Sequence, residues 1–261
     1  MSAHEFCKVE REGPLTVITL NRPDVMNALH PPAHFELAAV FDEFAADADQ
    51  WVAIVTGAGD RAFSAGNDLK YQAAGGKMSA PPSGFGGIAS RFDLDKPVIA
   101  AVNGIAMGGG FEIALACDII VAADTAIFAL PEPRVGLAAL AGGLHRLPRE
   151  IGPKQALGMI LTGRRVSADE GARLGFVNEV APRSNLLPAA KRWASQILEL
   201  SPMSVRASKQ AVYRGLEEPS VQAALTNQRN YPAVAAMFRS EDFVEGPRAF
   251  AEKRQPQWKG R

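Results

Sequence analysis

Two glutamates stand in surroundings that would change their chemistry. Glu112 follows three consecutive glycines at positions 108–110 and is otherwise surrounded by apolar residues. Burial disfavours the charged form of a carboxyl group and raises its pKa toward the range that is useful for proton transfer. Glu132 lies between two prolines, which limit the conformations of its backbone. The pair is typical of acid–base chemistry, although each glutamate also fits a structural carboxylate whose hydrogen bonds are satisfied.

The three glycines indicate a second kind of site. Glycine lets a ligand approach the main chain closely, and the helix predicted after residues 108–110 begins with unpaired N–H groups and the positive end of its dipole. Such an arrangement binds an anion or a developing oxyanion. Close packing of the helix against a strand would need the same glycines, so the residue pattern leaves both interpretations open.

Ser64 supports a different class of enzyme. Residues 62–66, Ala-Phe-Ser-Ala-Gly, resemble the G-x-S-x-G nucleophile motif without its first glycine, and Asp118 or Asp124 followed by His145 gives the chain order of a catalytic triad. A serine hydrolase that uses Ser64 is therefore the alternative from another class. The pattern places a loop before Ser64 instead of a strand, which favours a structural role for this serine.

Two further motifs are weaker. Residues 57–62 resemble a dinucleotide-binding fingerprint, but no helix pattern and no acidic residue follow at the required places, so we predict a turn. His30 and His34 have a spacing that suits a metal on a helix, but two prolines stand between them and no H-E-x-x-H motif is present. We expect both histidines on the surface, and we expect no metal and no nicotinamide cofactor.

The composition argues against several classes of protein. The 28 basic and 28 acidic side chains give a formal net charge of zero, which argues against a nucleic-acid binder and a membrane-surface protein. With 47% hydrophobic residues, the chain can bury a large core. The two cysteines, Cys7 and Cys117, form no C-x-x-C motif, and residues 1–13 contain no apolar run typical of a leader. We therefore expect a cytoplasmic protein.

The pattern of apolar residues predicts an α/β fold. Strands are predicted at residues 15–20, 51–56, 97–102, 118–123, 126–130 and 176–180, and helices after residues 31–32, at 108–110 and from 154 onward. The loosely repeated order of strand, strand and helix indicates a stacked core over residues 1–182. Residues 183–261 are almost entirely helical and must bury their apolar stripes on the core or on a neighbouring subunit. Residues 73–87, rich in Gly, Pro, Ala and Ser, are predicted to form a mobile loop.

Four ordered motifs together resemble the crotonase (enoyl-CoA hydratase/isomerase) family. They are Phe-Ser-Ala-Gly-Asn-Asp-Leu-Lys at 63–70, Lys-Pro-Val-Ile-Ala-Ala-Val-Asn-Gly at 96–104, Gly-Gly-Gly-Phe-Glu at 108–112 and Leu-Pro-Glu at 130–132. Within this family the chain most resembles carnitinyl-CoA dehydratases, on residues 63–66, the glycine-rich loop before Lys96, and the C-terminal segments 249–254 and 258–261. Two departures concern substrate specificity: Asn67 stands where that subfamily usually has Trp, and residues 138–141 replace a turn that contains Pro.

The resemblance implies a fold, an assembly and a set of roles. It implies a stacked β-β-α spiral core and a C-terminal helical region used for trimerisation, commonly as a dimer of trimers. The backbone N–H groups of Asn67 and Gly109 would hold the thioester carbonyl oxygen. Glu112 would activate water, and Glu132 would exchange the proton at the α-carbon. Coenzyme A would be part of an acyl-CoA substrate and not a cofactor.

The same resemblance implies contacts with coenzyme A. These are assigned to Ala28, Ala65, Asp68, Leu69 and Lys70, and to Lys253 acting on the nucleotide of a neighbouring subunit. Glutamates at both positions favour reversible hydration of a 2-enoyl-CoA over isomerisation.

The resemblance does not decide the acyl group. A trimethylammonium group would favour an aromatic lining, which Tyr71, Phe85 and Phe92 offer, but these rings would equally serve to pack the loop. A third hypothesis, a catalytically silent or RNA-binding relative, is disfavoured by the zero net charge and by the presence of both glutamates.

Overall fold

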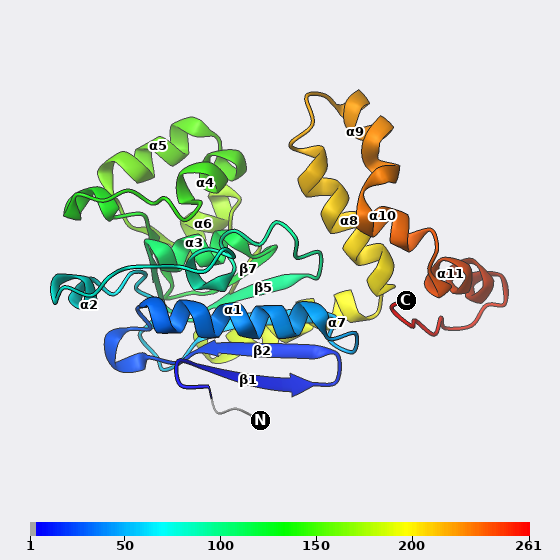
Figure 1. The fold of residues 1–261 in the computed structure, drawn as a ribbon, viewed down its shortest axis with the longest axis horizontal. Helices are drawn as coiled ribbons and strands as arrows, with labels where there is room; N and C mark the ends of the chain where they lie inside the picture. Colours follow the sequence, from blue (N-terminus) through cyan, green and yellow to red (C-terminus); the bar gives the residue numbers. More distant parts are fainter. Residues whose placement is uncertain (1–3) are drawn as a thin grey trace.

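The computed structural model describes residues 4–261, so the first three residues of the segment expected to carry no leader lie outside the described residues. The chain forms two β-sheets (Figure 1). The first sheet has the strand order β1 (Cys7–Glu12), β2 (Leu15–Leu20), β3 (Val52–Gly57), β5 (Val98–Val102), β7 (Ile119–Ala123) and β10 (Glu179–Ala181). The second has the order β4 (Ala62–Ser64), β6 (Ile105–Met107), β8 (Ile127–Ala129) and β9 (Val166–Ser167).

The strands alternate between the two sheets along the chain. The pairs β3–β4, β5–β6 and β7–β8 each place one strand in the first sheet and the next in the second. Within each sheet these strands run parallel to one another, whereas β1–β2 and β8–β9 are antiparallel. The predicted α/β spiral of strand, strand and helix is therefore confirmed.

Eleven α-helices accompany the sheets within residues 4–261. They are α1 (Pro31–Ala46), α2 (Leu69–Ala73), α3 (Gly109–Ala116), α4 (Gly143–Ile151), α5 (Pro153–Thr162), α6 (Ala168–Leu174), α7 (Leu186–Leu198), α8 (Pro202–Gly215), α9 (Val221–Asn227), α10 (Pro232–Met237) and α11 (Glu241–Ala251). In this part of the chain no helix combines the length and the apolar character needed to cross a bilayer.

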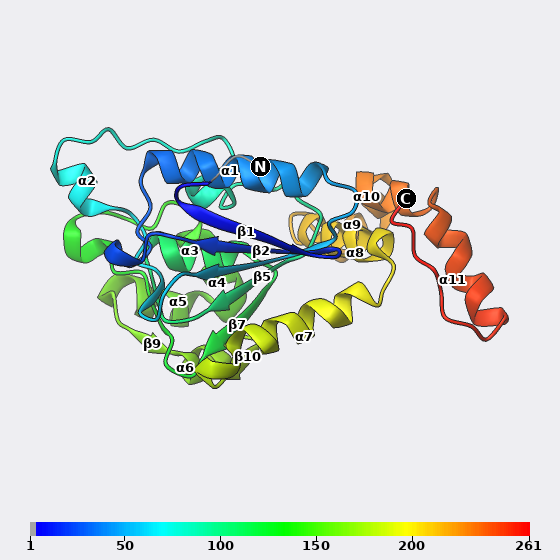
Figure 2. The same ribbon diagram turned by 90° about the horizontal axis from the view of Figure 1, so that it is seen from below.

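The first sheet is covered on both faces. Every residue of β5 is buried, which is typical of a parallel strand that lies between two layers. Figure 2 shows this sheet between α1 and α7. Helix α7 turns a stripe of four buried residues toward β3, β5 and β7, namely Leu186, Ala189, Ala190 and Ala194. The expected division after residue 182 falls before α7, although the buried face of α7 belongs to the main core.

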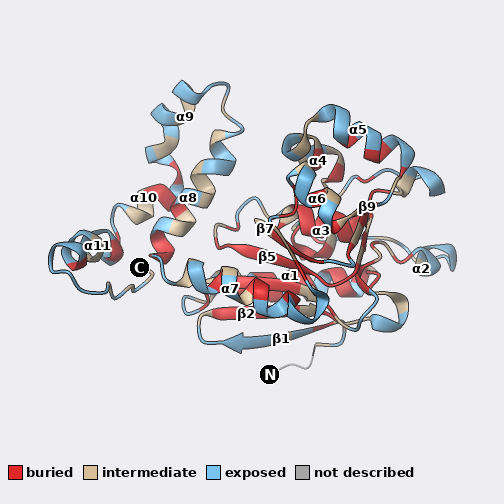
Figure 3. Ribbon diagram, turned by 180° about the vertical axis from the view of Figure 1, so that it is seen from behind, coloured by how far each residue is buried: buried red, intermediate tan, exposed pale blue. Residues whose placement is uncertain are grey.

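Helices α8–α11 stand apart from this core (Figures 1 and 3). Their buried side chains form a small second cluster of Ala207, Tyr231 and Val234. Polar contacts tie α8 to the core: Lys209 Nζ donates to Asp118 Oδ2 at 2.8 Å, and the Tyr213 hydroxyl donates to Asp118 Oδ1 at 3.1 Å. Much of their apolar surface is left exposed in the single chain.

Three predictions about local structure need correction. The loop predicted to be mobile at 73–87 ends in packed structure, because Gly86 and Gly87 are buried and Phe85 lies against the start of α3. The last predicted strand is displaced to 179–181, because Phe176 and Val177 before it fill the core. The loop expected before Ser64 is strand β4, which ends at that serine. In addition, strand β1 was not predicted, since of its side chains only Cys7 is buried.

A ring cluster connects α3, β8 and the segment before β10. The rings of Phe111, Phe128 and Phe176 have centroid distances of 5.1–5.2 Å, and none is more than 2% exposed. We expect Phe176→Ala to lower the free energy of unfolding by about 3–5 kcal/mol. Phe35→Ala on the outer face of α1, where the ring is 50% exposed, should change it by less than about 0.5 kcal/mol. Urea unfolding of both variants at equal protein concentration measures these changes. Equal losses of unfolding free energy in the two variants would contradict this packing.

Candidate active site

Main-chain hydrogen bonds fix the loop that contains Asn67. The Leu29 N–H donates to the Gly66 carbonyl at 2.8 Å, and the Asp68 N–H donates to the Leu29 carbonyl at 2.9 Å. These bonds lie on both sides of Asn67 and leave its own N–H unused. The segment before α1 therefore sets the position of this loop through the backbone.

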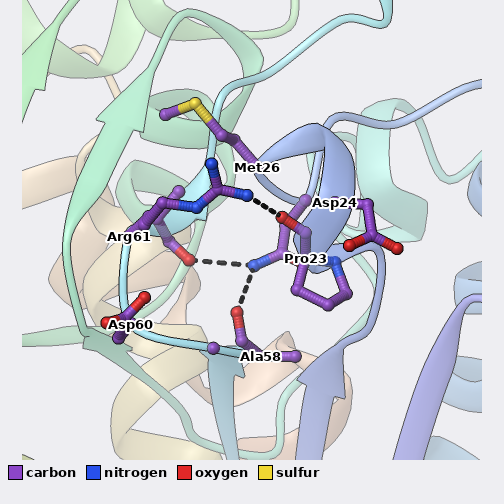
Figure 4. A pocket seen from close by; sticks show the side chains of 9 residues that line it. Pro23, Asp24, Met26, Ala58, Asp60 and Arg61 are labelled. Carbon is purple, nitrogen blue, oxygen red and sulfur yellow. Dashed lines mark hydrogen bonds between the residues drawn. The ribbon is translucent and has the colours of Figure 1, made fainter.

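The side chain of Asn27 supports the same region from below the loop. Its amide donates to the carbonyls of Ala58 and Ala62, at 3.0 and 2.9 Å. Figure 4 shows these bonds at a cavity of about 160 Å³, where Arg61 also points toward Pro23 and donates to its carbonyl. Neither Glu112 nor Glu132 lines this cavity, so we assign no catalytic role to it.

The start of α3 lies beside the Asn67 loop. A Cβ atom added to Gly66 would lie 2.8 Å from the backbone nitrogen of Gly109, which shows how closely the two segments approach. Gly109 is the first residue of α3, so its N–H has no acceptor within the helix. Within residues 4–261 no protein group accepts a hydrogen bond from the N–H of Asn67 or of Gly109. The two donors therefore lie on adjoining segments.

Two of the three glycines are required by contacts of the site. Gly108 has φ 52° and ψ −124°, and a Cβ atom there would lie 2.6 Å from Oε1 of Glu132. A Cβ atom on Gly109 would collide with the ring of Phe85. The sequence left open whether these glycines serve close packing or ligand approach. The structure shows close packing, and within residues 4–261 it leaves the Gly109 N–H without a protein acceptor.

Glu112 is buried one turn into α3, with 3% of its surface exposed. Its Oε1 accepts a hydrogen bond of 2.8 Å from the N–H of Gly143, the first residue of α4. Burial raises the pKa of Glu112 to about 7, and the nearby Glu132 adds to this effect while the Gly143 hydrogen bond opposes it. A carboxyl group with this pKa exchanges protons readily near neutral pH.

Glu132 begins the short 3₁₀ helix Glu132–Val135 and reaches back over Gly108. Its Oε2 is buried and has no hydrogen-bond partner within residues 4–261. Burial raises the pKa of Glu132 above its usual value. The carboxylate of Glu132 therefore lies beside the first residues of α3, the helix that contains Glu112.

The residues assigned to coenzyme A fall into two groups. Asp68 is buried, caps α2 through the Tyr71 N–H and pairs with Arg22 at 2.9 Å, so its carboxylate is already satisfied. Ala28 is buried in the adjoining segment, and its carbonyl accepts from Arg22. Ala65, Leu69 and Lys70 are at least partly exposed nearby, and only these three offer accessible side chains.

Lys253 lies far from that group. It is exposed just after α11, with φ 53°. In Figures 1 and 2, α11 and α2 lie at opposite ends of the molecule. Lys253 and Lys70 therefore do not belong to one site within a single chain.

Ser64 lacks the surroundings of a nucleophile. Its side chain is fully buried, and Oγ donates to the Asn27 carbonyl at 2.8 Å and accepts from the Gly66 N–H at 3.1 Å. Both partners are main-chain groups, whereas an activated serine needs a base within hydrogen-bond reach. The Ser64 carbonyl also lies where a Cβ on Gly110 would be. These contacts remove the observation behind the serine hydrolase alternative.

The expected surface position of the histidines is wrong for His34. This side chain is 1% exposed, and its Nδ1 accepts a hydrogen bond of 3.1 Å from the Gly86 N–H. Burial lowers the pKa of His34 to about 4, so it remains the neutral acceptor that this bond requires. His30 is partly exposed and lies at the N-cap of α1 beside the ring of Tyr71.

One group of side chains has metal-ligating types. His4, Cys7 and Glu36 can bring one ligand atom each within 4.8 Å of one another. The Glu36 carboxylate, however, already accepts from the N–H groups of Glu5, Phe6 and Cys7 at 2.7–2.9 Å. These hydrogen bonds explain why Glu36 lies beside His4 and Cys7: its carboxylate holds the start of β1 in place.

The three candidate aromatic side chains have separate neighbours. Tyr71 packs at 5.6 Å from His30, and Phe85 packs at 4.3 Å from His34, as centroid distances. Phe92 is 79% exposed, with Cζ of Arg146 5.7 Å from its centroid. The loop-packing interpretation fits Tyr71 and Phe85, and the three rings make no shared cage.

Sequence reasoning missed two residues of α4, namely Gly143, whose N–H donates to Glu112, and Arg146. Gly143 follows Gly142 directly at the start of α4, and this pair resembles the glycine run before α3. The same argument about unpaired N–H groups would have indicated it. Arg146 gave no signal, because its contact with residue 89 depends on the tertiary fold.

Comparison with known proteins identifies the family. The family model for enoyl-CoA hydratase/isomerase matches residues 10–261. A carnitinyl-CoA dehydratase of Citrobacter koseri is 46% identical over 258 residues, covering 96% of this chain and 97% of that protein.

Solved structures agree with this result. An enoyl-CoA hydratase from Mycobacterium tuberculosis H37Rv superposes with a TM-score of 0.91 at 37% identity, covering 98% of this chain and 99% of the other. A carnitinyl-CoA hydratase from Mycobacterium avium gives a TM-score of 0.78 at 40% identity, covering 99% of this chain and 100% of the other. With a family match over nearly the whole chain and the same fold, the protein belongs to the enoyl-CoA hydratase/isomerase family.

Proposed function

We propose that this chain is a hydro-lyase that reversibly adds water to the double bond of a 2-enoyl-CoA thioester. The observation that supports this most directly is the meeting of two carboxyl groups and two unused backbone N–H groups at the start of α3. Its relatives named carnitinyl-CoA dehydratase and enoyl-CoA hydratase support the same reaction class.

The backbone donors act on the thioester. Addition of water to the conjugated system moves negative charge onto the thioester carbonyl oxygen. The N–H groups of Asn67 and Gly109 hydrogen-bond this oxygen and stabilise its enolate character, because they are already oriented before the reaction begins. Loss of one such donor typically costs about 3 kcal/mol in the transition state.

The two glutamates move the protons. In hydration, ionised Glu112 takes a proton from water as the oxygen attacks the β-carbon, and protonated Glu132 delivers a proton to the α-carbon. In dehydration the two roles reverse. Burial raises the pKa values of both groups, and the negative charge of Glu132 opposes ionisation of Glu112, which favours a state with one group ionised and the other protonated. The chemistry requires neither a metal nor a redox cofactor.

Coenzyme A serves as the handle of the substrate. We assign its binding to the segment of Ala28 and Ala65 and to Asp68, Leu69 and Lys70, with Asp68 acting as a cap of α2.

The acyl group is the open part of the proposal. Because Tyr71, Phe85 and Phe92 form no shared cage, they give no support for a trimethylammonium group. Assays of crotonyl-CoA, longer enoyl-CoAs and crotonobetainyl-CoA by loss of enoyl-thioester absorbance decide among these substrates.

We further propose a homotrimer, or a dimer of trimers, built through residues 183–261. Support comes from the apolar side chains that this region leaves exposed, among them Val212, Leu216, Val221, Leu225, Val244 and Phe250. A cytoplasmic location also stays a proposal, consistent with two buried thiols that form no disulfide. The silent or RNA-binding alternative gains no support, since both glutamates occupy the buried site.

The glutamates provide the first test. Glu112→Gln and Glu132→Gln keep size but remove the ionisable group, so each should lower the kcat of hydration by about 10² or more. The double variant should lose less than the product of the two effects, because both groups act on one transition state. Glu43→Gln on the exposed face of α1 is the matched control. Near wild-type kcat in either folded site variant would refute the mechanism.

The pH dependence of hydration provides a second test. Glu112 must be ionised to act as a base, so kcat/KM should fall as the pH drops through about 7, the value to which burial raises its pKa. Glu132 must be protonated, so activity should fall again at higher pH as it ionises. The two limbs belong to the pair as a whole. A rate that stays constant from about pH 5 to pH 9 in stopped-flow or steady-state assays contradicts this assignment.

The assembly is tested separately. Because α8–α11 leave large apolar side chains uncovered, light scattering at micromolar concentration should give three or six times the mass of the 27.8 kDa chain. Leu216→Glu on the exposed end of α8 should shift the mass toward the monomer, whereas Lys154→Glu on α5 should not. A monomeric wild-type protein is the opposing result.

A further inference from the structure

Arg146 contacts two separate turns of the chain. Its Nη2 donates to the carbonyl of Ala89 at 2.8 Å. Its Nη1 lies against Gly142, at the place where a Cβ atom of that residue would be. Gly142 is the N-cap of α4, with φ 111°, and the next N–H in the chain, that of Gly143, holds Glu112. The guanidinium therefore packs on the turn that orients the glutamate.

The Ala89 side of this contact leads to the oxyanion donors. The Ala89 N–H donates to the Phe85 carbonyl at 3.2 Å, which closes residues 85–89 into a single turn. The Phe85 ring at the start of this turn lies against Gly109, and His34 fixes the turn through the Gly86 N–H. One side chain thus joins the turn that holds Glu112 to the turn that packs on Gly109.

The charge of Arg146 is not explained by an ion pair. It is half-buried, and within residues 4–261 no carboxylate forms a salt bridge with it. Desolvation of a guanidinium without a carboxylate partner costs free energy, so packing alone gives little reason to place a cation here. The contact with the Phe92 ring, at 5.7 Å, recovers only part of that cost.

The ionisable groups around the two residues come from four elements. Those that act on Arg146 or Glu112 are Cys117 at the end of α3, Glu132 of the 3₁₀ helix, Glu150 of α4 and Tyr213 of α8. The positive charge of Arg146 favours the ionised form of Glu112, whereas the negative charge of Glu132 disfavours it. The cation therefore opposes the effect of burial at the group that must be charged.

We propose that Arg146 is a positioning residue for hydration, which fixes the turn of Glu112 relative to the turn of Phe85 and places its positive charge beside the turn that holds Glu112. This inference rests on the proposed function. A purely structural arginine would also stabilise the two turns, but its removal would leave the pH dependence of the reaction unchanged.

The test compares Arg146→Gln and Arg146→Lys with Arg149→Gln. Arg149 is an exposed arginine of the same helix whose guanidinium, among residues 4–261, donates only to the His145 carbonyl, so it is the matched control. Kcat, KM and the pH profile are measured for hydration of crotonyl-CoA or the best enoyl-CoA found, together with thermal melting and mass.

For Arg146→Gln we expect kcat to fall by about tenfold or more with KM changed by less than about threefold. The acidic limb of the profile should move to higher pH, because the positive charge that favours ionised Glu112 is gone. Arg146→Lys should keep the limb in place but lose part of kcat, since a single ammonium group cannot make both contacts. Arg149→Gln should match the wild type.

Three outcomes overturn the inference. They are an unchanged kcat in folded Arg146→Gln, a reduced kcat with an unmoved acidic limb in that variant, and, should Arg146→Gln fail to fold, an Arg146→Lys variant with the wild-type kcat. A wild-type protein without hydratase activity on any enoyl-CoA would instead refute the proposed function, so the two failures are distinguishable.

Discussion

The site depends on how closely other segments approach the glycines that begin α3. The carboxylate of Glu132 occupies the space beside Gly108, and the ring of Phe85 occupies the space beside Gly109. Any side chain at these two positions would push its neighbour away. The Asn67 loop also lies against the helix start, at Gly66, where the Gly109 N–H has no acceptor within the helix. Close packing of three segments and an unpaired backbone donor therefore occur at the same place.

Burial at this point creates a problem of charge. A carboxyl group that is 3% exposed resists ionisation, yet water activation needs the ionised form. The Gly143 N–H opposes that effect by donating a hydrogen bond to Glu112. The positive charge of Arg146 opposes it as well. Glu132 acts in the other direction on Glu112, so one negative charge disfavours a second. The pair therefore favours a state in which one carboxyl group is ionised and the other carries a proton.

Local patterns in the sequence predicted much of this. The longer parallel strands were predicted from their apolar, β-branched runs, whereas the short strands β4 and β6 were not. Both glutamates were noticed because glycines or prolines flank them. Contacts between distant segments left no such pattern. Phe85 was assigned to a mobile loop, since its composition says nothing of the packing on Gly109 that orders its turn. Arg146 was missed because its partner, the Ala89 carbonyl, has no side-chain identity to read.

The placement of Lys253 links the site to the assembly. The segment of Ala28 and Lys70, to which coenzyme A binding is assigned, lies by α2, whereas Lys253 follows α11 at the other end of the molecule (Figure 1). A contact between Lys253 and coenzyme A would therefore need a second copy of the chain. The proposed neighbour would also cover the exposed apolar side chains of α8–α11, which nothing within residues 4–261 covers. Both features would be satisfied by one neighbour that docks on the helical region, so the complete substrate site would be a property of the oligomer.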